Sequence, residues 1–188
     1  MPLLSRLAKE SVELTGGDLA GACIGTSDSM TELQGIHFHR TRLKDVDLSY
    51  AELSVGFNLS YLRRVDFTHA YFDRCQMRKA TLLECDFAGA RLIVDLTDTL
   101  CQQCRFAAAV FYGGRIGHEY GGRRVRFVDC DFSNATFERV EFRASRFINC
   151  TLSGAHFVAC DLRGVKLEGT AAPEAGQFEA MDAPAWAG

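Results

Sequence analysis

The stretch that decides the fold runs from Phe127 to Leu167 and reads FVDCDFSNATFERVEFRASRFINCTLSGAHFVACDLRGVKL. Every fifth position of this stretch holds Phe or Leu without an exception. The residues at these positions are Phe127, Phe132, Phe137, Phe142, Phe147, Leu152, Phe157, Leu162 and Leu167. A fixed period kept over nine units is an internal repeat, and a repeat outranks local signals in predicting a fold.

A second set of residues repeats with the same period. Two positions before each large residue stands a small or β-branched one. These residues are Val125, Cys130, Ala135, Val140, Ser145, Cys150, Ala155, Cys160 and Val165. Most of the positions between them carry Asp, Arg, Glu, Asn, Thr or Gly. We therefore expect one large and one small residue of every five to face the interior, with the polar residues outside.

The same period extends upstream in three runs, and one residue is missing at each boundary between runs. The large positions are Leu33, Phe38, Leu43, Leu48 and Leu53, then Phe57, Leu62, Phe67, Phe72, Met77, Leu82, Phe87 and Leu92, then Leu96, Cys101, Phe106 and Phe111. The missing residues are local irregularities in one continuous repeat.

A period of five matches neither the 3.6 residues of a helical turn nor the alternation of a single strand. It requires a chain that turns a corner every five residues. Four short sides make a square coil of twenty residues, and stacked coils pair as parallel strands about 4.8 Å apart. The interior of so narrow a tube has room for one bulky side chain per side, so the second inward residue must be small.

Several five-residue units resemble the A(D/N)LXX units of the pentapeptide-repeat proteins. Examples are Cys130–Asn134, Ala155–Ala159 and Cys160–Gly164. The resemblance covers residues 12–169 and implies an all-β fold, a right-handed quadrilateral parallel β-helix of about 6 to 7 coils. It says less about function, because one fold supports many functions.

The two ends of the chain depart from the repeat. Leucines of residues 1–11 follow helical spacing, which predicts a short helical cap over the first coil, and we expect a short helical cap at the C-terminal end as well. The tail, residues 170–188, is rich in Ala, Gly and Pro but carries Phe178, Met181 and Trp186. Three roles stay open for the tail: a cap on the last coil, the contact of a homodimer, or a linker.

The composition is that of an ordinary water-exposed protein. Of 188 residues, 47% are hydrophobic and 24% are charged, and no apolar run approaches the roughly 20 residues of a membrane span. Residues 1–10 have only a brief apolar patch, without a secretory hydrophobic region. We therefore expect a cytoplasmic protein with no membrane partner.

The cysteines are predicted to be reduced core residues. Six of the eight fall on the small inward position, and Cys101 falls on a large one, so at most Cys23 is expected to react quickly with thiol reagents. Cys101 and Cys104 have the spacing of a zinc pair, but no second CxxC or His pair accompanies them. We predict no metal and no cofactor.

Two segments interrupt the repeat. Gly25–Glu32 is polar and is either a small loop or an irregular side of a coil. Gly113–Arg124 has a Gly-Gly pair near each end and is predicted to leave the coil as a loop. Its candidate partner-binding residues are Arg115, His118, Tyr120, Arg123 and Arg124. A solvated connector is the alternative interpretation of this loop.

The sequence favours protein binding over catalysis. No GxxxxGK(S/T) or GxGxxG motif occurs, and neighbouring polar residues arise at every coil of a rod, so we predict a non-enzymatic module that presents a rigid surface to a protein partner. The alternative, implied by the family resemblance and by the similarity of Asp161–Leu167 to the end of the quinolone-resistance members, is a DNA mimic that binds and protects DNA gyrase or topoisomerase IV. Against it, residues 33–169 hold 19 Lys and Arg and 16 Asp and Glu, without an excess of acid. Interspersed charges also argue against direct nucleic-acid binding.

Overall fold

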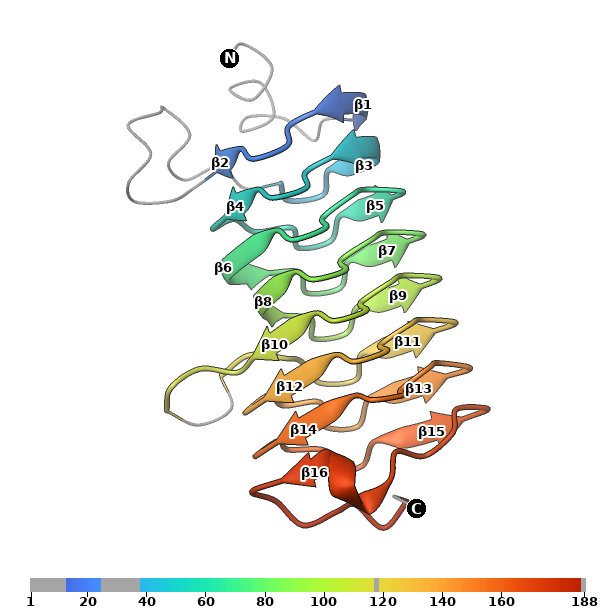
Figure 1. The fold of residues 1–188 in the computed structure, drawn as a ribbon. Coiled ribbons are helices and arrows are strands. Elements are labelled where there is room, and N and C mark those ends of the chain that lie inside the picture. The colour runs from blue at the N-terminus through green and yellow to red at the C-terminus, as the bar shows by residue number, and fades with distance from the viewer. Residues whose placement is uncertain (1–12, 25–37, 117–118, 187–188) are drawn as a thin grey trace.

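The chain forms an elongated stack of coils built almost wholly from β-strands (Figure 1). This computed structural model describes residues 13–24, 38–116 and 119–186. It confirms the predicted fold class, a right-handed quadrilateral parallel β-helix, with about seven turns. The predicted helical cap 1–11, the polar segment 25–32 and His118 lie outside the described residues.

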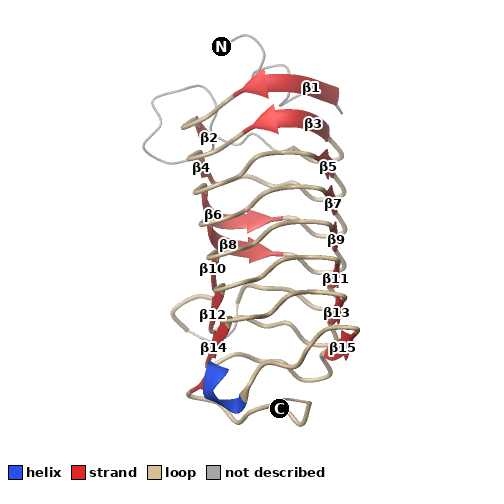
Figure 2. Cartoon of the chain, turned by 45° about the vertical axis from the view of Figure 1, so that its right-hand side comes forward, coloured by secondary structure: helices blue, strands red, loops and turns tan. Residues whose placement is uncertain are grey.

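Two sheets of eight parallel strands run along the rod (Figures 1 and 2). The first sheet contains, in spatial order, β1 (Glu13–Asp18), β3 (Arg42–Asp47), β5 (Tyr61–Arg63), β7 (Thr81–Leu83), β9 (Leu100–Gln102), β11 (Arg126–Val128), β13 (Arg146–Ile148) and β15 (Lys166–Glu168). The second contains β2 (Cys23–Ile24), β4 (Glu52–Leu53), β6 (Tyr71–Gln76), β8 (Arg91–Asp95), β10 (Val110–Tyr112), β12 (Thr136–Glu138), β14 (His156–Val158) and β16 (Phe178–Glu179).

Two further sides complete the square and are joined by single parallel bridges. We call one of them the Asp side; its bridges join Asp47, Asp66, Asp86, Arg105, Asp131 and Thr151. We call the other the Arg side; its bridges join Gly56, Gln76, Asp95, Gly121, Glu141 and Asp161. Along the chain the order of sides is first sheet, Asp side, second sheet and Arg side.

Stacked aromatic rings fill the interior of the tube. Phe127 and Phe147 stack with ring centroids 4.9 Å apart, and Phe137 and Phe157 stack at 4.8 Å. Of the nine large residues between Phe127 and Leu167, all are buried except Leu167, which is half-buried in the last described coil. Many rings lie on a ring of the coil before, because parallel pairing in register repeats the same inward position; Phe127 lies instead on Cys101, and Phe111 on Leu92.

The missing residues of the sequence pattern correspond to corners that lack one residue. Phe127 lies opposite Phe147, twenty residues later, but Leu82 lies opposite Cys101, nineteen residues later. Most corners contain a residue in the left-handed region, such as Arg64 at φ 50°. The four-residue side after Leu92 has none, and β8 continues directly through that corner.

Small inward residues with a hydroxyl or thiol bond to the preceding coil. The Cys75 thiol donates to the Leu53 carbonyl at 3.1 Å, and the Cys160 thiol donates to the Phe137 carbonyl at 3.2 Å. At this kind of corner the carbonyl makes no turn bond, and the thiol donates a further hydrogen bond to it. Cysteine therefore serves the fold as a small apolar residue with a donor.

The described part of the tail continues the stack over the second sheet. Phe178 stacks on Phe157 at 5.2 Å, and the Trp186 ring meets the edge of Phe178 at 5.9 Å. In place of the predicted helical cap, the C-terminal end has one turn of 3-10 helix, η1 (Ala175–Gln177). No helix formed by the described residues is long and apolar enough to cross a bilayer.

The first prediction concerns the core. Phe127→Ala should lower the free energy of unfolding by about 3 to 5 kcal/mol, because it opens a cavity among four surrounding rings. Arg126→Ala, one position away and exposed, should change it by less than about 0.5 kcal/mol. A denaturant titration measures both, and equal effects would contradict the assignment of inward and outward positions.

The second prediction concerns the thiols. The seven described cysteines are free and buried, and burial raises the pKa of Cys75 and of Cys160 to about 12. Because all seven are buried, and the thiolates of Cys75 and Cys160 are also scarce at pH 8, these cysteines should label slowly in the folded protein and fully in denaturant, as counted by mass spectrometry. Rapid labelling of Cys101 and Cys104 in the folded protein, or stoichiometric zinc in the purified protein, would contradict the prediction that these cysteines are core residues. The side chain of Cys23 lies outside the described structure.

Candidate interaction surface

The outward side chains of successive coils form columns, because every coil repeats the same five positions in register. On the Asp side the column residue caps its own turn. The Oδ1 atom of Asp66 accepts the N–H of Thr68 at 2.8 Å, and that of Asp131 accepts the N–H of Ser133 at 2.9 Å. The carboxylates thus have a structural use, which explains why Asp recurs immediately before the large residue.

The Arg side carries a column of guanidinium groups that pair with acids. Arg123 Nε lies 2.8 Å from Glu141 Oε1, and Arg163 binds both oxygens of Asp161 at 2.8 and 2.5 Å. The hydrogen bonds from Arg163 hold the pKa of Asp161 below its usual range. Because neighbouring charges neutralise one another, this side offers few free charges to a ligand.

One coil is longer than its neighbours, in the region of the predicted loop Gly113–Arg124. Cys101 lies opposite Phe127, twenty-six residues later, so this coil holds six residues more than a regular one. The coil is left after Gly113 and rejoined at Tyr120, because Gly113 donates to Glu138 in the next coil and the carbonyl of Tyr120 accepts from Glu141. The Gly113 carbonyl closes the base of the loop by accepting the N–H of Glu119 at 2.8 Å.

The glycines around the loop belong to the rod. A Cβ atom on Gly113 would lie 1.8 Å from the carbonyl oxygen of Arg139, and one on Gly121 would lie 2.4 Å from that of Glu141. Neither position can carry a side chain while the coils stay paired. These two glycines were assigned to the loop from sequence, but close main-chain packing is the reason for them.

The predicted partner-binding residues divide between loop and rod. Arg115 is exposed on the loop, and its carbonyl accepts a hydrogen bond from Arg139 at 3.1 Å. Tyr120 is half-buried at the base of the loop, and burial raises its pKa. Arg123 and Arg124 lie on the Arg side, where Arg124 pairs with Asp98 at 2.7 Å. The structure therefore does not gather all of these residues into one loop surface.

A groove separates the loop from the second sheet, with a volume of about 580 Å³. Its apolar and aromatic lining includes Tyr71, Ile93, Tyr112, Ile116 and Tyr120. Its charged lining consists of Asp73, Arg74, Arg91, Arg115 and Glu119. The sheet residues of this groove were missed by sequence analysis, although Tyr71 and Ile93 are large residues at outward positions and could have been noted.

Exposed apolar side chains lie around this groove. Ile116 is 83% exposed, Tyr71 is 37% exposed, and Val110 beside them is 36% exposed. The guanidinium of Arg91 lies over the Tyr71 ring at 5.8 Å, and neither Arg91 nor Arg115 forms an ion pair with any described residue. Exposed aromatic and aliphatic groups beside unpaired arginines are typical of protein interfaces.

Comparisons with known proteins agree with the repeat. A family model described as a pentapeptide repeat region matches residues 123–180, and one described as pentapeptide repeats in eight copies matches residues 60–93. Among curated protein sequences none matches the chain.

The solved structures that match this chain share little sequence with it. A trypsin-treated variant of QnrB1, a plasmid-mediated fluoroquinolone resistance protein, is 16% identical with a TM-score of 0.54, covering 84% of this chain and 92% of that chain. HetL, a pentapeptide repeat protein involved in heterocyst differentiation regulation from the cyanobacterium Nostoc sp. strain PCC 7120, is 16% identical with a TM-score of 0.26, covering 85% of this chain and 84% of that chain. The first of these likenesses is one of fold alone.

Proposed function

The chain belongs to the pentapeptide-repeat family, and we propose that it is a non-enzymatic interaction module that binds a protein partner in the cytoplasm. The observation that supports this proposal most is the groove beside residues 114–119. It combines exposed Ile116 and Tyr71 with the unpaired guanidinium groups of Arg91 and Arg115 on one side of the rod. Free buried thiols fit a reducing compartment.

The partner contact would combine an apolar centre with charged edges. Ile116 and Tyr71 supply area that a partner can cover, while Arg91 and Arg115 can accept carboxylates of the partner in two-pronged hydrogen bonds. Asp73 and Glu119 also line the groove, so its charge is mixed and suits a protein better than a nucleic-acid backbone. The rod fixes these groups on paired strands, and little order has to be gained on binding.

A specific observation favours the alternative of topoisomerase binding by DNA mimicry. The Asp side carries Asp47, Asp66, Asp86 and Asp131 in one column, interrupted by Arg105. Asp45, Glu84 and Asp129 lie at the neighbouring corner, so carboxylates are concentrated here although the whole rod is near neutral. Some of them are paired: Arg64 lies between Asp45 and Glu84, and Arg105 pairs with Asp86 at 3.4 Å. One carboxylate per coil repeats about every 4.8 Å, within a factor of two of the phosphate spacing along a DNA strand.

The homodimer through the tail remains a prediction from the sequence. Phe178, Met181 and Trp186 pack partly buried against the core of their own chain, which supports the role of a cap. Their remaining exposed surface is where a second copy would have to bind.

The third prediction tests the groove. Replacing residues 114–119 with Gly-Ser, while keeping Gly113 and Gly121, should leave the thermal midpoint within a few degrees, because loop closure depends weakly on length. The same change should abolish the capture of the specific protein that the immobilised wild type retains from a lysate of the source organism, as identified by mass spectrometry.

Single substitutions refine this experiment. Ile116→Ser should weaken capture at least tenfold, because it removes the most exposed apolar side chain of the groove. Leu59→Ser is the matched control, because Leu59 has the same size as Ile116 and is 43% exposed. It lies at a corner of the Arg side, away from the groove. Capture that survives the loop replacement would place the contact elsewhere on the rod.

The fourth prediction tests the alternative in a DNA gyrase supercoiling assay, with and without a quinolone. If the Asp side mimics DNA, the wild type should inhibit or protect gyrase at micromolar concentration, and the combined change of Asp66, Asp86 and Asp131 to Asn should remove the effect. Asn can still accept the turn hydrogen bond through its amide oxygen, so the fold should persist without the charge. If the wild type has no effect on gyrase, the DNA-mimic alternative is wrong and only the groove proposal remains.

A further inference from the structure

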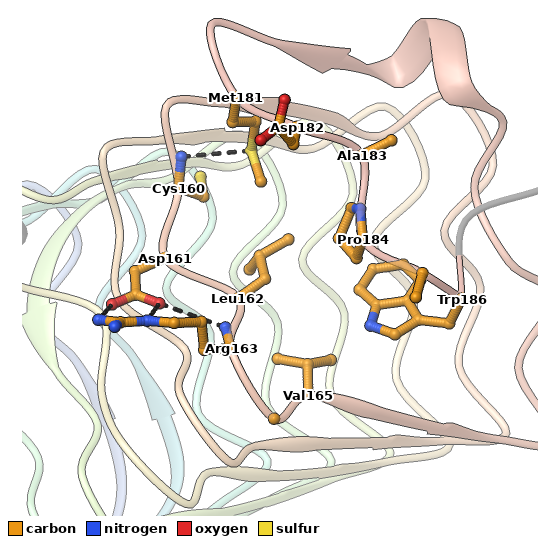
Figure 3. A pocket seen from close by; sticks show the side chains of 12 residues that line it. Cys160, Asp161, Leu162, Arg163, Val165, Met181, Asp182, Ala183, Pro184 and Trp186 are labelled. Carbon is orange, nitrogen blue, oxygen red and sulfur yellow. Dashed lines mark hydrogen bonds and ion pairs between the residues drawn. The ribbon is translucent and has the colours of Figure 1, made fainter.

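An open apolar hollow lies at the C-terminal end of the Arg side (Figure 3). Leu162 and Val165 of the last coil form its floor, and Pro184 and Trp186 of the tail form the opposite wall. Its volume is about 650 Å³, within the range of sites that take ligand groups. All of its lining residues belong to the described structure.

The hollow results from the size of one residue. Phe157 pairs with Phe178, and the Cys160 N–H lies 3.4 Å from the Met181 sulfur, so the tail follows the last coil twenty-one residues later. This register places Ala183 above Leu162. Most other coils fill the equivalent position with a large side chain, namely Phe57, Met77, Leu96, Phe142 and Leu162. The coil that holds the loop has Gly122 there, where the main chains pack so closely that a Cβ atom would lie 2.7 Å from the Leu96 carbonyl carbon. An alanine side chain cannot fill that space, and it stays open.

The floor of the hollow also has unpaired main-chain donors. In the coil before, Phe142 and Ala144 donate their N–H groups to Asp161 and Arg163, both at 2.9 Å. The equivalent donors of the last coil are Leu162 and Gly164, and within the described residues neither N–H has an acceptor. The tail passes above them, but no main-chain hydrogen bond joins residues 182–185 to residues 161–164 in the described chain.

We propose that this end of the Arg side binds an extended segment of a protein partner, which places a Phe- or Leu-sized side chain in the hollow. The proposal rests on the proposed function as a protein-binding module. The ladder of single bridges that joins the coils of the Arg side ends at Asp161, and the added segment would form its next rung. Its main chain would accept hydrogen bonds from Leu162 and Gly164, and its large residue would lie on Leu162, as in strand addition at other sheet edges.

The residues that earlier coils place on the Arg side indicate which side chains such a segment should carry. Each contributes a small residue, then a polar one, then a large apolar one, as in Val140, Glu141 and Phe142. Because residues 182–185 make no main-chain hydrogen bonds to the floor, a bound segment can displace them without breaking such bonds. The segment would therefore gain two hydrogen bonds and an apolar contact in a ready-made site.

A labelled synthetic peptide can test this site without knowledge of the partner. The probe is VEFRAS, the chain's own Val140–Ser145, measured by fluorescence anisotropy against the full-length protein. It should bind, and the peptide with Phe142→Ala should bind at least tenfold more weakly. In the protein, Ala183→Leu should weaken binding of the probe at least tenfold, because leucine occupies part of the hollow. Ala175→Leu, an exposed position outside the hollow, should leave binding unchanged.

Other outcomes overturn the proposal. These are equal binding of the two peptides, equal binding by wild type and Ala183→Leu, or no binding of the probe. A wild-type mass of two chains in sedimentation equilibrium that Ala183→Leu halves would identify a second copy as the occupant instead. In thermal melting, the Ala183→Leu protein should be at least as stable as wild type. If it is less stable, Ala183→Val replaces it in the binding experiment, with the same expected tenfold loss of affinity for the probe. The variant lacking residues 114–119 should bind the probe like wild type, so a failure of the groove proposal is distinguishable from a failure of this one.

Discussion

Main-chain hydrogen bonds between successive coils are the interaction on which the rest of this structure depends. They hold the coils in register, so that inward side chains of successive coils stack on one another and outward side chains of successive coils become neighbours. The stacked phenylalanines and the columns of charge are consequences of that register. Where the bonds stop, as at Leu162 and Gly164, the rod has an unsatisfied edge.

The core could be predicted from the sequence because its cause is local and periodic. A large residue every fifth position and a small one two before it leave one arrangement in which both face inward, and Phe142 with Val140 shows it in the structure. The slips could be seen as well, since a missing residue is visible in the spacing. The reason for them, a corner without a left-handed residue after Leu92, needed the backbone.

The candidate sites were harder to predict because they depend on which residues of different coils become neighbours. Coils of twenty and nineteen residues bring Tyr71, Arg91 and Val110 together along the second sheet, and no fixed spacing in the sequence reveals it. The ends of the loop were misplaced because Gly121 resembles a flexible hinge in sequence, whereas it packs against Glu141. Composition also averages over all four sides, which hid the acidic column of the Asp side.

The constant rise per coil fixes the spacing of side chains along the axis of the rod. Two groups on the same side can be separated along the axis only by whole multiples of about 4.8 Å, and their separation changes only when a coil of about twenty residues is gained or lost. A substitution can change the side chain that a coil exposes, but it cannot change the position of that coil along the axis. Divergence among such proteins should therefore alter chemistry by point mutation and reach by duplication or deletion of whole coils.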